Sequence, residues 1–167
     1  MKKLFLTFAL AFSAFQLSAQ DGNRNIGIGV QSSFPTFGLS ARIGVTEQIQ
    51  VQPIIAPFSA SSGDFGYSVT FFGARGIYRF TETDRVAVPY GFAGAGLIRS
   101  TLKMGSLGSQ SSNMLGWSLG AGLEFFPGFL DNLGASIELG YGSMNVGAAG
   151  ASISGITYGV GLHYYLN

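Results

Sequence analysis

The sequence predicts an all-β protein, an eight-stranded antiparallel up-and-down transmembrane β-barrel, and three observations point to this fold class. Eight segments alternate apolar with small or polar residues at period two, which is the side-chain period of a β-strand. Tight polar turns alternate with small-residue loops, as expected when all turns lie at one end of a barrel and all loops at the other. Only 10% of the residues are charged, whereas a soluble domain usually has about 25%.

The N-terminal residues 1–19 are expected to form a signal peptide that is cleaved after Ala19. Two lysines precede an apolar run from Leu4 to Leu17, and a small-residue cleavage site follows. An uncleaved membrane anchor is the weaker interpretation, because the run is shorter than the 18 or so residues of a spanning helix. Residues 20–167 are then expected to form a single barrel domain. The sequence contains no cysteine, which excludes a lipid-attachment thiol, disulfides and thiolate metal sites.

The eight expected strands follow one another without a helical segment between them. They are residues 23–33, 36–45, 48–59, 66–80, 85–100, 113–126, 132–144 and 151–166. Turns are expected near 46–47, 81–84 and 127–131, and loops near 32–35, 59–66, 100–112 and 145–150. Lipid offers no hydrogen bonds to an open sheet edge, so the first and last strands are expected to pair and close the barrel.

The two faces of these strands differ in a way that favours a membrane barrel over a soluble sandwich. One face is apolar and free of charge, and a basic residue there would cost about 2–4 kcal/mol at the bilayer midplane. The other face is rich in glycine and serine, which suits a crowded interior better than a surface in water. Aromatic residues gather toward the strand ends, as in the girdles of membrane barrels: Tyr78, Phe80, Phe125 and Tyr164 near the turns, and Trp117 and Tyr141 nearer the loops.

The fifth segment does not keep one apolar face. Val86, Val88, Tyr90 and Phe92 share one parity, whereas Ala95 and Leu97 share the other. A β-bulge near residues 92–96 would return all of them to a single lipid-facing side. The sequence therefore predicts a bulge there.

A few charged and polar residues fall on the face assigned to the lumen. Two cations and two anions are expected to form an ion-pair network there, because an isolated buried ion would lose several kcal/mol of solvation: Arg42, Arg75, Glu124 and Glu138. Their distances from the nearest turn pair Arg75 with Glu138 at mid-height and Arg42 with Glu124 lower down. A plugged lumen is the preferred interpretation, since eight strands enclose little more than side chains. A gate whose partners exchange is the alternative.

The residues give catalysis little support. His163 is the only histidine, and it lies near the turn end, where we expect it to be a hydrogen-bonding residue of the lumen. Without clustered ligands or a carboxylate pair in the loops, no catalytic site, metal site or cofactor is predicted. The nearly balanced charge gives no sign of nucleic-acid binding.

The mature chain resembles the small outer-membrane β-barrel family of Gram-negative bacteria, which includes the OmpX-like and OmpA-barrel-like proteins. The resemblance rests on the signal peptide, the eight segments and the ending "YGVGLHYYL" (158–166), which is similar to a barrel-assembly signal. The matching elements are Tyr158, Gly161, Tyr164 and Leu166, although the chain ends in Leu166-Asn167 rather than in an aromatic residue. The resemblance implies outer-membrane lipid as the surroundings, and the barrel-assembly machinery and periplasmic chaperones as transient partners.

The functional expectation is a non-enzymatic outer-membrane barrel with a polar, plugged lumen that serves envelope structure or surface interaction. The alternative is a narrow channel or transport barrel for ions or small apolar compounds. A secreted soluble β-sandwich is the third class. It would appear in the aqueous fraction without detergent.

Overall fold

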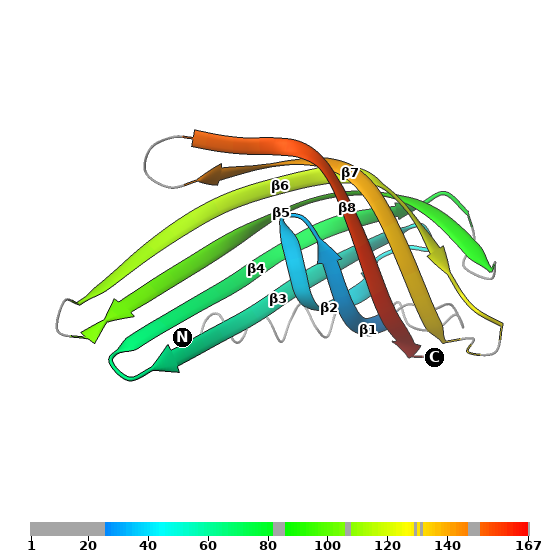
Figure 1. The fold of residues 1–167 in the computed structure, drawn as a ribbon. Coiled ribbons are helices and arrows are strands. Elements are labelled where there is room, and N and C mark those ends of the chain that lie inside the picture. Colours follow the sequence, from blue (N-terminus) through cyan, green and yellow to red (C-terminus); the bar gives the residue numbers. More distant parts are fainter. Residues whose placement is uncertain are drawn as a thin grey trace, which may run out of the picture.

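The computed structural model describes residues 26–81, 86–105, 108–128, 130, 132–146 and 151–166, which form a closed antiparallel barrel with strand order β1 to β8 (Figure 1). This confirms the predicted fold class. The strands are β1 Ile26–Ser33, β2 Thr36–Gly44, β3 Ile49–Ser62, β4 Phe65–Arg79, β5 Ala87–Met104, β6 Ser109–Phe125, β7 Leu133–Val146 and β8 Ala151–Leu166. The expected signal peptide, residues 1–19, lies outside the described residues. Within them, no helix is long and apolar enough to span a membrane.

The first and last strands close the barrel, as the sequence predicted. β1 pairs with β8 in an unbroken antiparallel register that runs from Ile26 opposite Leu166 to Ser33 opposite Gly159. β8 also pairs with β7 from Ala151 to Tyr164. We call the end with the β2–β3, β4–β5 and β6–β7 connections the turn end, and the opposite end the loop end.

Two of the expected loops are wrong, because strand continues through most of them. β3 and β4 are joined by only Gly63 and Asp64, and β5 and β6 are joined by residues 105–108. Gly63 and Gly105 have φ values of +57° and +52°, in the left-handed region that tight turns use and glycine adopts easily. Serines and other polar residues in these segments gave the appearance of loops, although they occupy strand positions.

The expected bulge in β5 is also wrong. β5 keeps one unbroken register with both neighbours, so that Ala95 lies opposite Ala74 on β4 and Trp117 on β6. Tyr90 and Phe92 are consequently buried in the lumen, with 1% and 5% of their surface exposed. These two rings can point inward because glycines on the neighbouring strand β6 leave space for them.

Glycine at two positions of β6 is required by these inward-facing rings. A Cβ built on Gly122 would lie 2.5 Å from Cζ of Tyr90, and one on Gly120 would lie 2.9 Å from Cζ of Phe92. Either distance is too short for a side chain. The large apolar residues of β5 therefore fill the interior where β6 has no side chain, and the small residues of β5 face outward.

Candidate functional site

The charged residues of the lumen come from four strands and meet in the half of the barrel nearer the turn end. β2 supplies Arg42, β4 supplies Arg75 and Arg79, β6 supplies Glu124, and β7 supplies Glu138. Each has at most 6% of its surface exposed. Their strands place them there because each occupies the inward parity of its strand, alternating with outward apolar residues.

Arg75 and Glu138 form a bidentate ion pair at mid-height of the lumen. The two guanidinium nitrogens Nη1 and Nη2 of Arg75 lie 2.8 and 2.6 Å from the carboxylate oxygens of Glu138. The hydroxyl of Tyr90 donates to the same carboxylate at 2.6 Å, and Nε of Arg75 donates to Oε1 of Gln52 at 2.7 Å. The guanidinium also lies over the ring of Phe92, 4.9 Å from its centroid. Every side of this pair is thus held by a neighbour.

Arg42 and Glu124 form a second pair closer to the turn end. Nη1 of Arg42 lies 2.7 Å from Oε1 of Glu124, and both side chains are fully buried. Tyr165 on β8 donates its hydroxyl to Glu124 at 2.7 Å. Arg79 approaches the other carboxylate oxygen of Glu124 at 3.4 Å. The structure therefore brings together both pairs expected from the sequence, in the expected order of height.

Three members of the network escaped the sequence reasoning: Arg79, Tyr90 and Tyr165. Arg79 has the same parity as Arg75 on one strand, which is a signal that could have identified it. Tyr165 likewise has the parity of His163. Tyr90 gave no such signal, because it lies in an apolar run and was assigned to the lipid face through the expected bulge.

The described lumen has one more cation than anion. Arg42, Arg75 and Arg79 face Glu124 and Glu138, which gives a formal charge of +1 (three minus two). Part of the excess is met by dipoles and π-faces, since Arg79 also donates to the Tyr165 hydroxyl at 3.2 Å and lies 5.7 Å from its ring centroid. The interior is therefore positive, although the whole chain is nearly neutral.

Two apolar layers enclose the network. Val88, Phe126 and Tyr165 pack together on the turn side, and Ile54, Ala56 and Phe71 pack together on the loop side. Between them the polar side chains bond to one another. In such an arrangement, removing one partner would leave a buried charge without compensation.

His163 lies inside this network and has the first two elements of a hydrolytic triad. Its Nε2 lies 2.7 Å from Oγ of Ser40 and 3.0 Å from Nε2 of Gln52. Its Nδ1, where an orienting carboxylate would bind, has no hydrogen-bond partner in the structure. Both Ser40 and His163 are buried. The geometry is that of a hydrogen-bonding residue of the interior.

The residues similar to an assembly signal occupy both faces of β8. Tyr158, Tyr164 and Leu166 point outward with 84%, 52% and 48% of their surfaces exposed. Gly161 faces inward, where a Cβ would collide with the amide of Gln31 on β1.

The described residues contain no group of three His, Cys, Asp or Glu that could hold a metal ion.

Comparison with solved structures finds the same fold in bacterial outer-membrane proteins. The N-terminal β-barrel domain of Pseudomonas aeruginosa OprF matches with a TM-score of 0.50 and 21% identity over 83% of this chain and 95% of that chain. Neisserial surface protein A matches with a TM-score of 0.50 and 16% identity over 84% of this chain and 93% of that chain. No protein-family model and no curated protein sequence matches. The chain thus has the fold of the small eight-stranded outer-membrane β-barrels, as the sequence resemblance implied.

Proposed function

We propose that the protein is a non-enzymatic outer-membrane β-barrel with a sealed lumen that serves envelope structure or surface interaction. The observation that carries the proposal is the combination of an apolar outer face with an interior filled by mutually bonded ions. Leu39, Leu119 and Leu139 expose 63%, 52% and 64% of their surfaces outward, which is costly in water and favourable in lipid. Inside the barrel, the ion pair of Arg75 and Glu138 occupies the centre of the lumen.

A location in the outer membrane would require transient partners for export and insertion. Export would proceed through the signal peptide expected at residues 1–19, followed by periplasmic chaperones and the barrel-assembly machinery as transient partners. The position of β8 supports the last of these, since the strand that carries Tyr158, Gly161, Tyr164 and Leu166 is the one that closes the sheet. Outer-membrane lipid would surround the apolar face.

Two measurements on one folded sample test the proposal. The protein is refolded in detergent and checked for a change in gel migration on heating, and the same sample is recorded in a planar bilayer. A heat-modifiable band without steady conductance is expected. Recovery of most of the cellular protein in the aqueous fraction without detergent would contradict the membrane location, and steady conductance of the wild-type protein would contradict the sealed lumen.

A narrow channel is the second candidate, and the excess positive charge of the lumen favours one form of it. A pore lined by Arg42, Arg75 and Arg79 would attract anions and repel cations. If the barrel conducts, its current is expected to be anion-selective and to change when Glu138 is replaced by Gln. Cation-selective current would show that the ions do not pass this network.

A further inference from the structure

The part of the barrel nearest the loop end has its chemistry reversed. The period-two alternation continues, but the outward positions become polar and the large inward side chains become mostly apolar. Outward residues here include Thr70, Arg99, Asn113, Ser143 and Ser154. The large apolar inward residues include Phe58, Val69, Ile98, Leu102, Met104, Met114, Met144 and Ile153, and uncharged Ser62, Ser100, Gln110 and Ser112 share their parity. We call the apolar concave surface made by these inward residues the cup.

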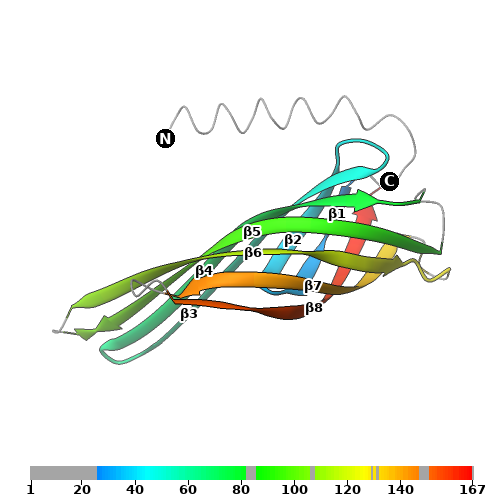
Figure 2. The ribbon, with the colours of Figure 1, turned by 90° about the horizontal axis from the view of Figure 1, so that it is seen from above.

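The cup is open on one side of the sheet. β1 and β2 have only 8 and 9 residues, whereas β3 to β8 have 14 to 18. Residues 56–62 of β3 have no ladder partner on β2, and residues 151–158 of β8 have none on β1. Figures 1 and 2 show the short β1–β2 hairpin between β8 and β3, with the longer strands running past it. We call this opening the notch.

The exposure of β8 supports the notch. Ile156 and Tyr158 expose 79% and 84% of their surfaces, more than the other large apolar residues of the described strands. No neighbouring strand covers them on the β1 side. Both still lie in the outward apolar band, because the polar outward positions of β8 begin at Ser154. The lower part of the notch is therefore level with the band that would face lipid.

The floor of the cup is the tip of the β1–β2 hairpin, which bends across the lumen. A Cβ built on Gly116 of β6 would lie 2.8 Å from Cβ of Pro35, and one on Gly142 of β7 would lie 3.2 Å from Cδ1 of Phe34. The tip thus rests against the opposite wall. It separates the cup from the polar network below.

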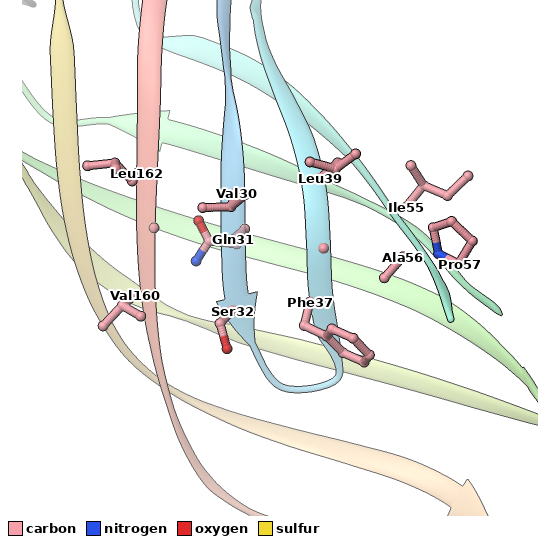
Figure 3. Close-up of a pocket in the computed structure, with 12 residues that line it drawn as sticks. Val30, Gln31, Ser32, Phe37, Leu39, Ile55, Ala56, Pro57, Val160 and Leu162 are labelled. Carbon is pink, nitrogen blue, oxygen red and sulfur yellow. The ribbon is translucent and has the colours of Figure 1, made fainter. Parts of the chain in front are cut away.

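The inward bend leaves a depression on the outer surface of the barrel. The depression has a volume of about 740 Å³. Figure 3 shows Val30 and Leu39 over the hairpin, with Val160 and Leu162 of β8 on one side and Ile55 of β3 on the other. All five are outward apolar residues.

Phe37 connects the depression with the cup. It lines the depression, and its ring centroid lies 6.1 Å from that of Phe71, which packs with Ile54 and Ile98 at the base of the cup. The two rings meet where β2 and β3 separate. An apolar surface therefore continues from the outer band, past Phe37, into the cup.

We infer that the acyl chain of a membrane lipid enters the cup sideways through the notch. The inward strand residues of the cup include no charged side chain, and Arg99 and Lys103, the charged residues of β5 at this level, point outward. If water filled the cup, it would contact 57%, 40% and 60% of the surfaces of Phe58, Leu102 and Ile153. Each Å² of apolar surface removed from water stabilises a complex by about 25 cal/mol. Hydrocarbon is also the medium that the notch borders, because the outer apolar band is continuous with it.

This inference rests on the proposed membrane location, and its test separates the two. The chain has a single tryptophan, Trp117, which faces outward within the apolar band. The wild-type protein is placed in phosphatidylcholine vesicles whose acyl chains carry bromine, a quencher of tryptophan fluorescence. Quenching of Trp117 is expected. Its absence would overturn the membrane location and this inference with it.

The cup is probed by moving the tryptophan. In a Trp117→Phe background, Met114→Trp reports from the cup and Asn113→Trp reports from the outward polar face at the same height. Brominated chains are expected to remove most of the emission of the tryptophan at 114 and much less of the emission of the tryptophan at 113. Aqueous iodide should show the reverse order. Quenching at 114 by iodide and not by bromine, with Trp117 of the wild type quenched by bromine, would mean that water fills the cup.

A charge in the cup supplies a matched second variant. Leu102→Lys, in the Met114→Trp background, is expected to abolish most of the bromine quenching, and Thr101→Lys on the outward face of the same strand should leave it unchanged. Heat-modifiable migration shows that each variant is folded. Protection at 114 from both quenchers, together with a dimer in cross-linking, would mean that a second copy covers the cup, and would overturn the inference.

Discussion

Arg75 shows how the lumen is held together residue by residue. Its guanidinium contacts Glu138, Gln52 and the Phe92 ring, so its charge is compensated by one carboxylate and supported by a neutral acceptor and a π-face. The free energy of such a pair depends on both partners being present. Taking two ions out of solvent costs about as much as their attraction returns, but one ion alone has no return.

Replacing Glu138 by Gln is expected to lower the free energy of unfolding by about 3–5 kcal/mol, because Arg75 would stay buried without its counter-ion. The double replacement Arg75→Met with Glu138→Leu should regain most of that loss. The measurement is urea unfolding of the refolded protein in lipid vesicles. Glu47→Gln, in the exposed β2–β3 turn, is the control. A Glu138→Gln variant as stable as the control would show that water reaches the pair.

Glycine at position 122 is a second residue with a measurable role. Gly122→Ala is expected to destabilise the barrel by about 1–3 kcal/mol, because the added Cβ would meet the Tyr90 ring and force it to shift. Gly76→Ala is the matched control, since a Cβ there has open space around it. The comparison uses the same unfolding measurement. Equal stabilities would mean that Tyr90 does not lie against Gly122 in the folded protein.

At the scale of elements, β3 explains where the barrel opens. A proline has no N–H to donate to a sheet ladder. Pro53 and Pro57 share one parity, so both nitrogens face the same neighbour. The β3–β4 ladder is continuous past both residues, whereas the β2–β3 ladder is interrupted beside Pro53 and ends before Pro57. The notch is thus encoded on β3 by proline and on the other strands by the length of the β1–β2 hairpin.

β5 is the element on which the outward apolar band is best tested, because its faces differed from expectation. Ala93→Arg is expected to cost about 2–4 kcal/mol in vesicles, as for a basic residue near the bilayer midplane. Thr101→Arg, on the same face but in the polar part near the loop end, should cost close to nothing. Folding yield and urea unfolding measure both variants. Equal costs would place the whole outward face of β5 in one environment.

β5 also shows how far the sequence could predict the fold. The period of two and the number of segments predicted the barrel and its closure, because both follow from backbone geometry. They could not predict the inward side of β5, where apolar Tyr90 and Phe92 fill space left by Gly122 and Gly120 on another strand. The ion pairs were predictable since charge must be compensated. Arg79 was within reach by parity, but the notch depends on which strands are neighbours.

For the whole molecule, the structure contains two compartments of opposite chemistry. The compartment nearer the turn end holds bonded ions between the apolar layers of Phe126 and Phe71, and the compartment at the loop end is an open apolar cup. The hairpin tip at Phe34 and Pro35 lies between them. The hairpin tip and the bonded ions therefore both lie across the barrel axis, whereas the wall is incomplete beside the hairpin.

A single cysteine reports on the proposed sealed lumen, because the natural chain has none. Ser118→Cys places a thiol in the buried lumen, and Ser111→Cys places one on the outward polar face of the same strand. A water-soluble maleimide is expected to label position 111 readily and position 118 far more slowly in folded protein. After unfolding, both should react equally. Equal labelling of the folded variants would show that water enters the lumen.

The docking of the hairpin tip has a consequence for the order in which the chain acquires its structure. β1 and β2 are made first, yet the glycines that receive Pro35 and Phe34 lie at positions 116 and 142, some eighty to a hundred residues later. The earliest hairpin cannot reach its final place until β6 and β7 are present. Contacts so distant in sequence form slowly. The β1–β2 hairpin is therefore expected to dock only after β6 and β7 have taken up their places in the sheet.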